Sequence, residues 1–222
     1  NDTLIGNVVD NVLDGGDGVD SLSGGSGNDT YYVTLGDKVT EGKADGGVDT
    51  IISYCSWSLA STTSSTIENL TLDTSAGASD AIGNSLANTL TGNASSNTLS
   101  GGAGNDTLIG NAGVDILVGG KGADIFMFLS ALDTGTGSGQ RDIISDFIVS
   151  QGDKINLSSI DANTSSVGDD AFLFINSSNF TSAGQLRFAY NILAGDINGD
   201  GVADFEIQCT GVTKLTSQCF VL

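Results

Sequence analysis

Acidic and amide side chains recur at a fixed step of nine residues in this 222-residue chain, and this step constrains the fold more than any other feature. The unit is best preserved at 101–109, where Gly-Gly-Ala-Gly-Asn-Asp precedes Thr-Leu-Ile. In one block the acid or amide lies two residues before a large apolar residue: Asn88, Asn97, Asp106, Asp115 and Asp124 precede Leu90, Leu99, Leu108, Leu117 and Phe126. A second block opens the chain, with Asp2, Asn11, Asp20 and Asp29 before Leu4, Leu13, Leu22 and Tyr31.

Each unit joins a glycine-rich turn to a short strand-forming segment, so two units make one coil and like turns stack at every eighteenth residue. Glycine suits these turns because it enters left-handed φ without steric cost and leaves the backbone carbonyls free to point inward. A short fixed period is typical of a solenoid, whose core forms by stacking. We therefore predict an all-β fold, a parallel β-roll or β-solenoid, with a β-rich C-terminal cap.

The stacked acidic turns also predict a bound metal ion. Calcium takes roughly six to eight oxygen ligands and often mixes carboxylates with backbone carbonyls. The chain has 27 acidic and 7 basic residues, for a net charge of −20, and this self-repulsion opposes a compact state until counter-ions bind. Acidity that served solubility alone would not follow a nine-residue step. We expect several Ca²⁺ ions.

The two blocks resemble the repeats-in-toxin (RTX) family, whose nonapeptide forms a parallel β-roll that binds calcium between turns one coil apart. The resemblance implies one ion among Gly102, Gly104, Asp106, Gly119, Lys121 (through its carbonyl) and Asp124. It implies a neighbouring ion among Asn93, Ser95, Asn97, Gly110, Ala112 and Asp115. The same pattern extends the expected metal set to Asp2, Asn11, Gly15, Asp17, Asp20, Gly24, Ser26, Asp29, Gly101, Ala103, Asn111, Gly113, Gly120 and Gly122.

Several turns depart from the family pattern. Asn11, Asn88 and Asn97 replace the acid with a neutral side chain, and Val9, Leu86 and Ser95 stand where a glycine with positive φ is expected. We expect those sites to be weak or empty. The alternative for the asparagines is a ladder of side chains that hydrogen-bonds stacked turns without metal.

The composition divides the chain into a first repeat block at 1–33, connecting solenoid rungs at 34–82, a second repeat block at 83–128 and a C-terminal cap at 129–222. Within the connecting rungs, alternating apolar and β-branched residues predict strands at 48–53, 57–59 and 67–72. Spacing alone does not decide whether Asp37, Glu41 or Asp49 in these rungs binds an ion.

The cap begins with more aromatic and aliphatic bulk, as expected of a segment that covers an open solenoid end. Asp-x-Ile-x-Asp-Phe at 142–147 and Asp-Lys-Ile-x-Leu at 153–157 resemble the C-terminal domain of serralysin-type secreted metalloproteases. The resemblance implies that Asp146 and Asp153 complete the last calcium site with Gly120, Gly122 and Asp124. The alternative is that these two acids only cap turns.

A further acidic loop lies at 196–204, where Asp196, Asn198, Asp200 and Asp204 take positions 1, 3, 5 and 9 of an EF-hand-like pattern. Position 12 is Ile207, so the bidentate glutamate is missing, and strand-forming flanks predict a β-hairpin instead of a helix-loop-helix. The loop is therefore either a metal site or an acidic hairpin turn.

The chain has no histidine, which removes Ser-His-Asp, Cys-His and histidine-based zinc sites and argues against an enzyme. No apolar run approaches the roughly 20 residues that cross a bilayer. Its acidity disfavours nucleic acid as a partner. The sequence starts inside a repeat without Met or a signal peptide, so we expect a fragment or a processed product.

Three cysteines, Cys55, Cys209 and Cys219, have no metal-ligand spacing, and we expect buried apolar thiols, with a pairing of Cys209 and Cys219 as the alternative. The apolar end at 219–222 is similar to the uncleaved signal of type I secretion substrates; it is equally a candidate edge strand of the cap.

These features favour a non-catalytic module, secreted and extracellular, that unfolds in calcium-poor cytosol, passes the type I secretion apparatus and folds on Ca²⁺ binding outside the cell, supporting an upstream passenger. One alternative is a calcium-dependent surface protein, such as an adhesin, S-layer or filament subunit, that self-assembles through calcium. A weaker alternative is carbohydrate binding by the roll face.

Overall fold

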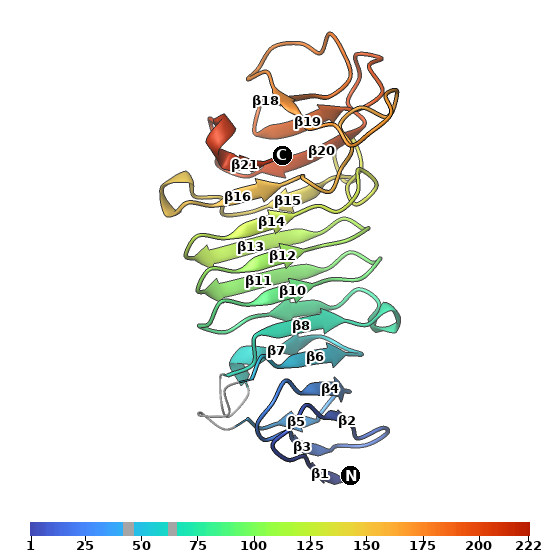
Figure 1. The fold of residues 1–222 in the computed structure, drawn as a ribbon, viewed down its shortest axis with the longest axis vertical. Coiled ribbons are helices and arrows are strands. Elements are labelled where there is room, and N and C mark those ends of the chain that lie inside the picture. The colour runs from blue at the N-terminus through green and yellow to red at the C-terminus, as the bar shows by residue number, and fades with distance from the viewer. Residues whose placement is uncertain (42–46, 62–65) are drawn as a thin grey trace.

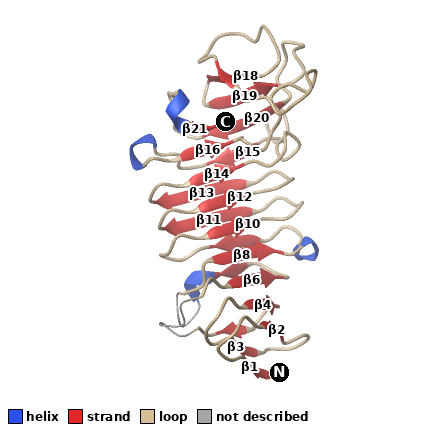
Figure 2. Ribbon diagram, viewed as in Figure 1, coloured by secondary structure: helices blue, strands red, loops and turns tan. Residues whose placement is uncertain are grey.

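The computed structural model describes residues 1–41, 47–61 and 66–222. The chain forms an elongated stack of coils, with the N-terminus at one end and the C-terminal cap at the other (Figure 1). The predicted all-β parallel solenoid is confirmed, because nearly every regular element is a strand. Figure 2 shows short helical turns at the edges of the stack, and in the described part of the chain these are η1 (Leu59–Ser61), η2 (Thr74–Ala76), η3 (Val149–Gln151) and η4 (Ser217–Cys219).

Two walls of strands enclose the core. One wall is a nine-stranded sheet, in the order β2 (Val12–Asp14), β4 (Thr30–Val33), β6 (Thr50–Ser53), β8 (Asn69–Leu72), β10 (Thr89–Thr91), β12 (Thr107–Ile109), β14 (Ile125–Met127), β16 (Lys154–Asn156) and β21 (Phe220–Val221). The other wall is interrupted. Its N-terminal part is a three-stranded sheet of β1 (Thr3–Ile5), β3 (Ser21–Ser23) and β5 (Lys38–Val39).

The rest of the second wall is another nine-stranded sheet, which runs from the repeats into the cap. Its order is β7 (Trp57–Ser58), β9 (Asp80–Ile82), β11 (Thr98–Ala103), β13 (Ile116–Lys121), β15 (Asp142–Ile144), β20 (Phe205–Cys209), β19 (Ile192–Asp196), β18 (Gln185–Ala189) and β17 (Leu173–Phe174).

Strand register follows the predicted eighteen-residue coil. Leu90 lies beside Leu108 and Leu108 beside Phe126 in one wall, and Leu99 lies beside Leu117 in the other, all in parallel pairs. The strands β11 and β13 extend into their turns, where Gly102 pairs with Gly120. Like turns are therefore stacked directly on one another along each side of the roll.

One inward apolar residue per strand builds the core. Leu22, Tyr31, Leu90, Leu99 and Leu108 are fully buried, whereas the flanking strand positions are partly or fully exposed. Each such leucine contributes roughly 1.5 to 3 kcal/mol by burial. The alternation arises because successive strand residues point to opposite faces.

The connecting segment keeps the same architecture with coils of different length. Strands β6, β7 and β8 lie within the three ranges where the sequence predicts strands. Thr50 pairs with Asn69, nineteen positions on, and Thr30 pairs with Thr50, twenty positions on. Residues 42–46 and 62–65 of the predicted connecting rungs lie outside the described part of the chain.

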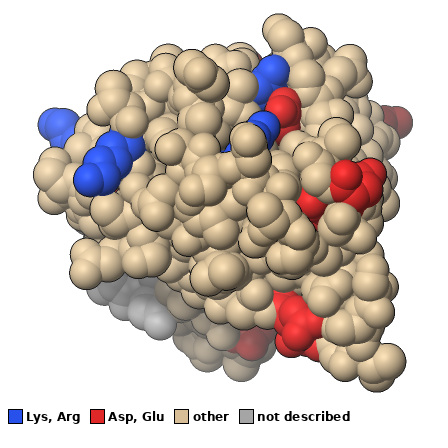
Figure 3. Space-filling model, turned by 90° about the horizontal axis from the view of Figure 1, so that it is seen from above, with Lys and Arg blue, Asp and Glu red and all other residues tan. Residues whose placement is uncertain are grey.

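The cap continues both walls. Strand β15 pairs in parallel with β13 and β20, and β18, β19 and β20 are antiparallel neighbours. The last strand, β21, pairs with β16, so the C-terminus is an edge strand, as one alternative predicted. Four of the seven basic residues, Arg141, Lys154, Arg187 and Lys214, follow residue 129, and the view onto the cap shows basic and acidic side chains together (Figure 3).

The cysteines are free thiols, and Cys209 and Cys219 are buried in the core of the cap. Burial, with a smaller contribution from neighbouring Cys219, raises the pKa of Cys209 to about 12. Cys209 and Cys219 therefore behave as the buried apolar residues that the sequence predicts. Cys55 is only partly buried, so the prediction is wrong there.

Candidate metal sites in the turns

The acid of each turn hydrogen-bonds across to the preceding coil. One carboxylate oxygen of Asp106 accepts the N–H of Asn88 at 2.7 Å, and one of Asp124 accepts the N–H of Asp106 at 2.9 Å. On the other side of the roll, Asp115 accepts the N–H of Asn97 at 2.7 Å. The carboxylates thus form two ladders that run along the stack, and they are buried at the turn ends of the strands.

The second oxygen of these carboxylates has no partner. The Oδ2 atoms of six ladder acids are buried and accept no hydrogen bond within the described residues; these acids are Asp20, Asp29, Asp106, Asp115, Asp124 and Asp142. A buried polar group without a partner costs about 1 to 3 kcal/mol, and more when it is charged. Six such oxygens in one stack have the chemistry of cation ligands.

Glycine keeps the space open beside five of these oxygens, those of all the acids except Asp142. A Cβ on Gly101 would lie 2.3 Å from Asp106 Oδ2 and 2.7 Å from the carbonyl oxygen of Gly119 on the next coil. A Cβ on Gly119 would lie 2.4 Å from Asp124 Oδ2, and one on Gly110 would lie 2.4 Å from Asp115 Oδ2. Glycine at the first position of the turn therefore leaves a space beside the carboxylate oxygen, and any larger residue would fill that space.

Backbone carbonyls complete the oxygen-rich environment. The carbonyl of Gly102 lies 2.2 Å from where Gly120 would carry a Cβ, and Gly120 has φ +98°. The carbonyl of Gly104 also faces the turn one coil on, at Gly122, which has φ +130°. Lys121 O accepts the N–H of Gly104 at 2.9 Å. The structure thus brings together the turns 101–106 and 119–124 that were predicted to share an ion.

Electrostatics shows the cost of leaving these acids without a cation. Burial raises the pKa of Asp106 to about 6 and that of Asp115 to about 7, although each accepts a backbone hydrogen bond that acts in the opposite direction. Burial also raises the pKa of Asp124, with Asp153 and Asp146 adding to the shift. A bound divalent cation would restore the charged form of each carboxylate.

Turns that end in asparagine are closed differently. Asn97 Oδ1 accepts the N–H of Asn93 at 2.8 Å, and Asn97 Nδ2 donates to the carbonyl of Ser79 at 2.9 Å. Asn88 makes the corresponding bonds, to the N–H of Asn84 and to the carbonyls of Ile67 and Glu68. The amide thus donates to carbonyl oxygens of the preceding coil, as expected for the metal-free ladder that was the alternative at these positions.

The same turns lack the second and fourth glycines, and an Asx turn takes their place. The side-chain oxygens of Asn7, Asn84 and Asn93 accept the N–H groups of Val9, Leu86 and Ser95 at 2.8 to 3.0 Å. Val9, Leu86 and Ser95 are not among the described residues with positive φ. We call 6–11, 83–88 and 92–97 the amide turns and 15–20, 24–29, 101–106 and 119–124 the acid turns.

Turn 110–115 combines both kinds. It ends in Asp115, whose Oδ2 is unpartnered, and Gly113 has φ +136°. At its second position Asn111 adopts φ +62° and donates from Nδ2 to the carbonyl of Gly92 at 2.8 Å. The ion predicted between this turn and 92–97 would therefore find one free carboxylate oxygen, from Asp115, and an Asn97 side chain already bonded. Its place as a metal site stays a prediction.

In the first block, Asp20 and Asp29 are buried ladder acids whose unpartnered oxygens lie beside Gly15 and Gly24. Asp2 and Asp17 are exposed, and Asp2 contributes its N–H to Asp20. Asn11 accepts the N–H of Asn7 at 2.8 Å. Two of the predicted acids in this block therefore have the geometry of a cation site.

Asp146 and Asp153 lie where the resemblance to serralysin-type domains implies, against the last acid turn. Asp146 accepts the N–H groups of Gly119 and Gly120 at 2.9 and 2.8 Å. Asp153 accepts the N–H of Asp124 at 3.1 Å and that of Ile148 at 2.7 Å. These are the bonds of turn caps, and a role as metal ligands remains a prediction.

The loop at 196–204 connects the antiparallel strands β19 and β20, so the predicted hairpin is confirmed. Its acids bind the loop's own backbone: Asp196 accepts the N–H groups of Gly199 and Gly201, and Asp204 accepts that of Ile197. Asn198 donates to Asp204 at 2.6 Å, and Asp200 accepts the N–H of Val202 at 2.8 Å. The acids therefore stabilise an acidic hairpin turn, and metal binding here stays a prediction.

The ladder also includes acids outside both blocks. Asp37, Asp49, Glu68 and Asp142 each accept the N–H of a ladder residue one coil earlier. Sequence analysis left Asp37 and Asp49 undecided and assigned no ladder role to Glu68 or Asp142. The signal was present, because each of the four lies two residues before an inward apolar residue, as in Asp142-Ile143-Ile144.

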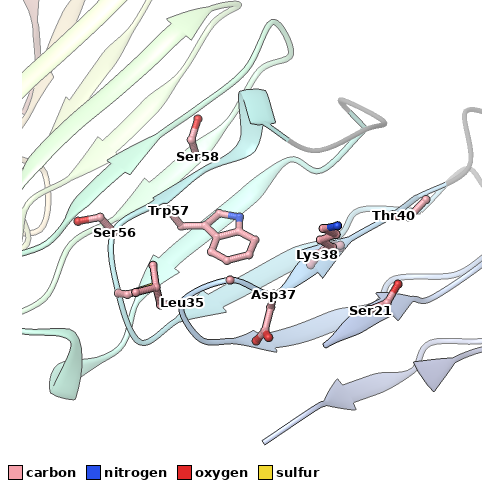
Figure 4. A pocket seen from close by; sticks show the side chains of 11 residues that line it. Ser21, Leu35, Asp37, Lys38, Thr40, Ser56, Trp57 and Ser58 are labelled. Atoms are coloured by element: carbon pink, nitrogen blue, oxygen red, sulfur yellow. The ribbon is translucent and has the colours of Figure 1, made fainter. Parts of the chain in front are cut away.

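A separate pocket of about 520 Å³ opens where the second wall is interrupted, between β5 and β7 (Figure 4). The ring of Trp57 lies in this opening, with Leu35 and Lys38 nearby. Of its lining residues only Asp37 belongs to the ladder, and both oxygens of Asp37 accept backbone N–H groups, from Asp20 and Thr34. The pocket therefore offers no unpartnered ladder oxygen.

A family model described as RTX calcium-binding nonapeptide repeat (4 copies) matches residues 1–31, 82–117 and 91–126. These are the coils that carry the acid and amide turns. The chain carries RTX calcium-binding repeats. No curated protein matches the chain.

Calcium is the metal of RTX repeats, which are generally non-catalytic and typical of secreted proteins. Carbonyl and carboxylate oxygens, without nitrogen or sulfur, are the ligands that calcium prefers. Within residues 1–41, 47–61 and 66–222, no three acid, Cys or His side chains cluster closely enough to hold a metal by themselves. An ion held in these turns would therefore need backbone carbonyls in addition to one or two carboxylates. Over the same residues no helix is long and apolar enough to span a membrane.

Proposed function

We propose that this chain is a non-catalytic calcium-binding RTX module that folds when it binds Ca²⁺ outside the cell and supports type I secretion and stability of an upstream passenger. The observation that carries the proposal is the row of buried, unpartnered carboxylate oxygens in the turns. Without a cation this row lowers the stability of the folded chain, and with a cation it raises that stability.

The ions we propose lie between acid turns one coil apart. The best-formed site combines the carboxylates of Asp106 and Asp124 with carbonyls of Gly102, Gly104, Gly119 and Lys121. A second uses Asp115 with carbonyls of the turns beside it. In the first block Asp20 and Asp29 provide the carboxylates. Asp146 and Asp153 close the last acid turn, and the 196–204 loop is a further candidate.

Coupling of binding to folding follows from mass action. A ligand that binds only the folded state stabilises it by about 2.7 kcal/mol per site at a hundredfold excess over Kd. Several sites together offset a large part of the ordering cost of a glycine-rich chain. In calcium-poor cytosol the same carboxylates repel one another and resist burial, which keeps the chain extended enough for a secretion channel.

The C-terminal end supports the secretion part of the proposal. Phe220 and Val221 form the last strand, and Val221 is half-exposed at the end of the wall. The similarity to type I signals and to serralysin-type C-terminal domains favours export through that apparatus. A short edge strand can detach from β16 without unfolding the roll, which leaves it accessible to an exporter.

Secretion of a fusion tests this function. An unrelated enzyme joined upstream of Asn1 should appear in the medium when a type I exporter is co-expressed, and its yield in folded form should rise with millimolar calcium. Removal of residues 219–222 should abolish export, and the Asp80→Asn change on an exposed strand position should not affect it. Equal export with and without residues 219–222 would contradict the proposal that these residues are the secretion signal. Export in cells without a type I exporter would contradict type I secretion.

A further inference from the structure

The two ladder acids Asp115 and Asp142 meet where the repeats join the cap. Asp142 Oδ1 accepts the N–H of Asp115 at 2.8 Å, across a step of 27 residues instead of 18. The step is longer because a larger loop, at 128–141, replaces the nine-residue turn. Both side chains have no exposed surface. Asp115 directly precedes β13 and Asp142 begins β15, and these strands are paired, since Ile116 lies beside Ile143.

Neither acid has a partner for its second oxygen. Asp115 Oδ2 and Asp142 Oδ2 are buried and accept no hydrogen bond from the described residues. The adjacent cation does not serve them, because Arg141 forms its ion pair with Glu206 at 3.2 Å. The loop contributes another negative charge in Asp133, whose Oδ2 accepts the N–H groups of Leu129 and Ser130.

The three negative charges reinforce one another. Burial raises the pKa of Asp142 to about 8, and Asp115 and Asp133 add to the shift. Asp133 likewise adds to the raised pKa of Asp115. The region is therefore a buried acidic junction with unpartnered carboxyl oxygens and no basic side chain bound to them.

We propose that Asp115 and Asp142, with backbone carbonyls of turn 110–115 and of the loop that follows β14, bind a calcium ion that joins the last RTX coil to the cap. Asp142 lies outside the residues matched as repeats. It falls on the nine-residue step, 18 residues after Asp124, although the ladder bond that it accepts comes from Asp115. Because the donors are all hard oxygens, calcium fits this site better than zinc or copper. The inference rests on the proposed calcium-coupled folding and adds a site to it.

The ion would act on the cap through strand β15 and the loop before it. Asp142 pairs with Ile207 and Ile144 pairs with Cys209 of β20. The loop binds the same strand, since Thr134 Oγ1 donates to the carbonyl of Glu206 at 2.7 Å and accepts the N–H of Asp142 at 2.8 Å. An ion bound to Asp142 should therefore stabilise the docking of β20 onto the roll.

An Asp142→Asn variant removes the charge and keeps the ladder. The chain itself places asparagine at the ladder positions 88 and 97, so an amide is compatible with this stack. The variant keeps an oxygen for the N–H of Asp115 and replaces the unpartnered oxygen with an NH₂ group. The matched control is Asp80→Asn, which makes the same change at an exposed position of β9 in the same wall.

The experiment is calorimetric titration of the full metal-free chain with calcium chloride, with hydrogen exchange at 205–209. We expect Asp142→Asn to bind one ion fewer than the wild type, with faster exchange in β20 in saturating calcium, and Asp80→Asn to match the wild type. In saturating calcium Asp142→Asn should retain the β-sheet signal of the repeats, which separates a lost ion from a failed fold.

Two results would overturn the inference. If the wild type binds several ions and Asp142→Asn binds the same number with unchanged exchange, the junction site is wrong and the proposed function stands. If the wild type binds no calcium, both fail. A loss of the β-sheet signal of the repeats by Asp142→Asn in saturating calcium would assign Asp142 a structural role and contradict the metal site.

Discussion

At the scale of single residues, the exchange of aspartate for asparagine separates two kinds of turn. Asparagine uses both ends of its side chain, because its oxygen accepts an N–H within its own turn and its amide donates to carbonyls of the coil before it. Aspartate accepts one N–H and leaves a buried oxygen unpartnered. The acid therefore lowers the stability of the metal-free turn and creates affinity for a cation.

The change Asp106→Asn should stabilise the metal-free chain and weaken the calcium-bound one. It removes a buried unpartnered oxygen, so we expect a gain of about 1 to 3 kcal/mol in chelator. In calcium the variant should lose at least one ion and be less stable than the wild type. The β-sheet signal in chelator and unfolding by urea in calcium measure the two effects. A weaker β-sheet signal in chelator together with lower stability in calcium would show that Asp106 is only structural.

The reverse change, Asn97→Asp, should add an ion. It places a carboxylate on the ladder opposite Asp115 and against the carbonyl of Ser79, where the native amide donates. We expect lower stability without calcium and one additional bound ion with it, counted by calorimetry. An unchanged ion count would mean that the carbonyls of an amide turn are not placed for a metal.

Acidification should stabilise the metal-free fold. The pKa values of Asp106, Asp115 and Asp142 are raised in the folded chain to about 6, 7 and 8, so the folded state binds more protons than the unfolded state. Their stabilising contribution is complete below the unfolded pKa, near 4, and is lost as pH rises through 6 to 8. In chelator the β-sheet signal should therefore grow from pH 8 to pH 5; a fall over that range would contradict the assignment of these buried acids.

At the scale of turns and strands, glycine determines which coils can stack closely. A Cβ at Gly122 would lie 1.7 Å from the carbonyl oxygen of Gly104, and the residue has φ +130°. Gly16 also has positive φ, +72°, but a Cβ there would meet nothing within 4 Å. Both positions need a positive φ, but only Gly122 is also crowded by the backbone of the neighbouring coil.

Alanine substitutions at these two glycines should therefore differ in effect. Gly16→Ala should cost about 1 kcal/mol from its backbone conformation alone. Gly122→Ala should cost clearly more, because it also forces two stacked turns apart, and it should reduce calcium affinity. Unfolding of both variants in saturating calcium makes the comparison, and equal losses would mean that the turns are not packed as closely as the structure shows.

Much of the arrangement of turns and strands is predictable from the sequence. The nine-residue step places Leu90, Leu108 and Phe126 in one row and their turns in one stack, because the coil length is constant there. The metal-free bonding of Asn97 was only one of two open alternatives, since spacing does not tell which groups an amide meets. Asp142 was missed because a larger loop changes the step from 18 to 27 residues. The break between β5 and β7 likewise follows coils of unequal length.

At the scale of the whole molecule, repulsion among the acidic residues destabilises the stacked fold until calcium binds. The net charge is −20, and buried ladder acids run through both repeat blocks and the start of the cap. The core is one row of inward side chains per wall, so each coil depends on its neighbours and folding should spread cooperatively along the stack. Calcium should therefore control the fold of the entire chain.

The most direct measurement is a calcium titration of the metal-free chain, followed by circular dichroism, calorimetry and light scattering on the same samples. We predict that the chain in chelator is largely disordered and that several ions bind cooperatively as a monomer converts from coil to β-structure. Particles that grow with calcium would instead indicate a surface assembly. A fully folded spectrum in chelator, or no binding at millimolar calcium, would contradict calcium-coupled folding.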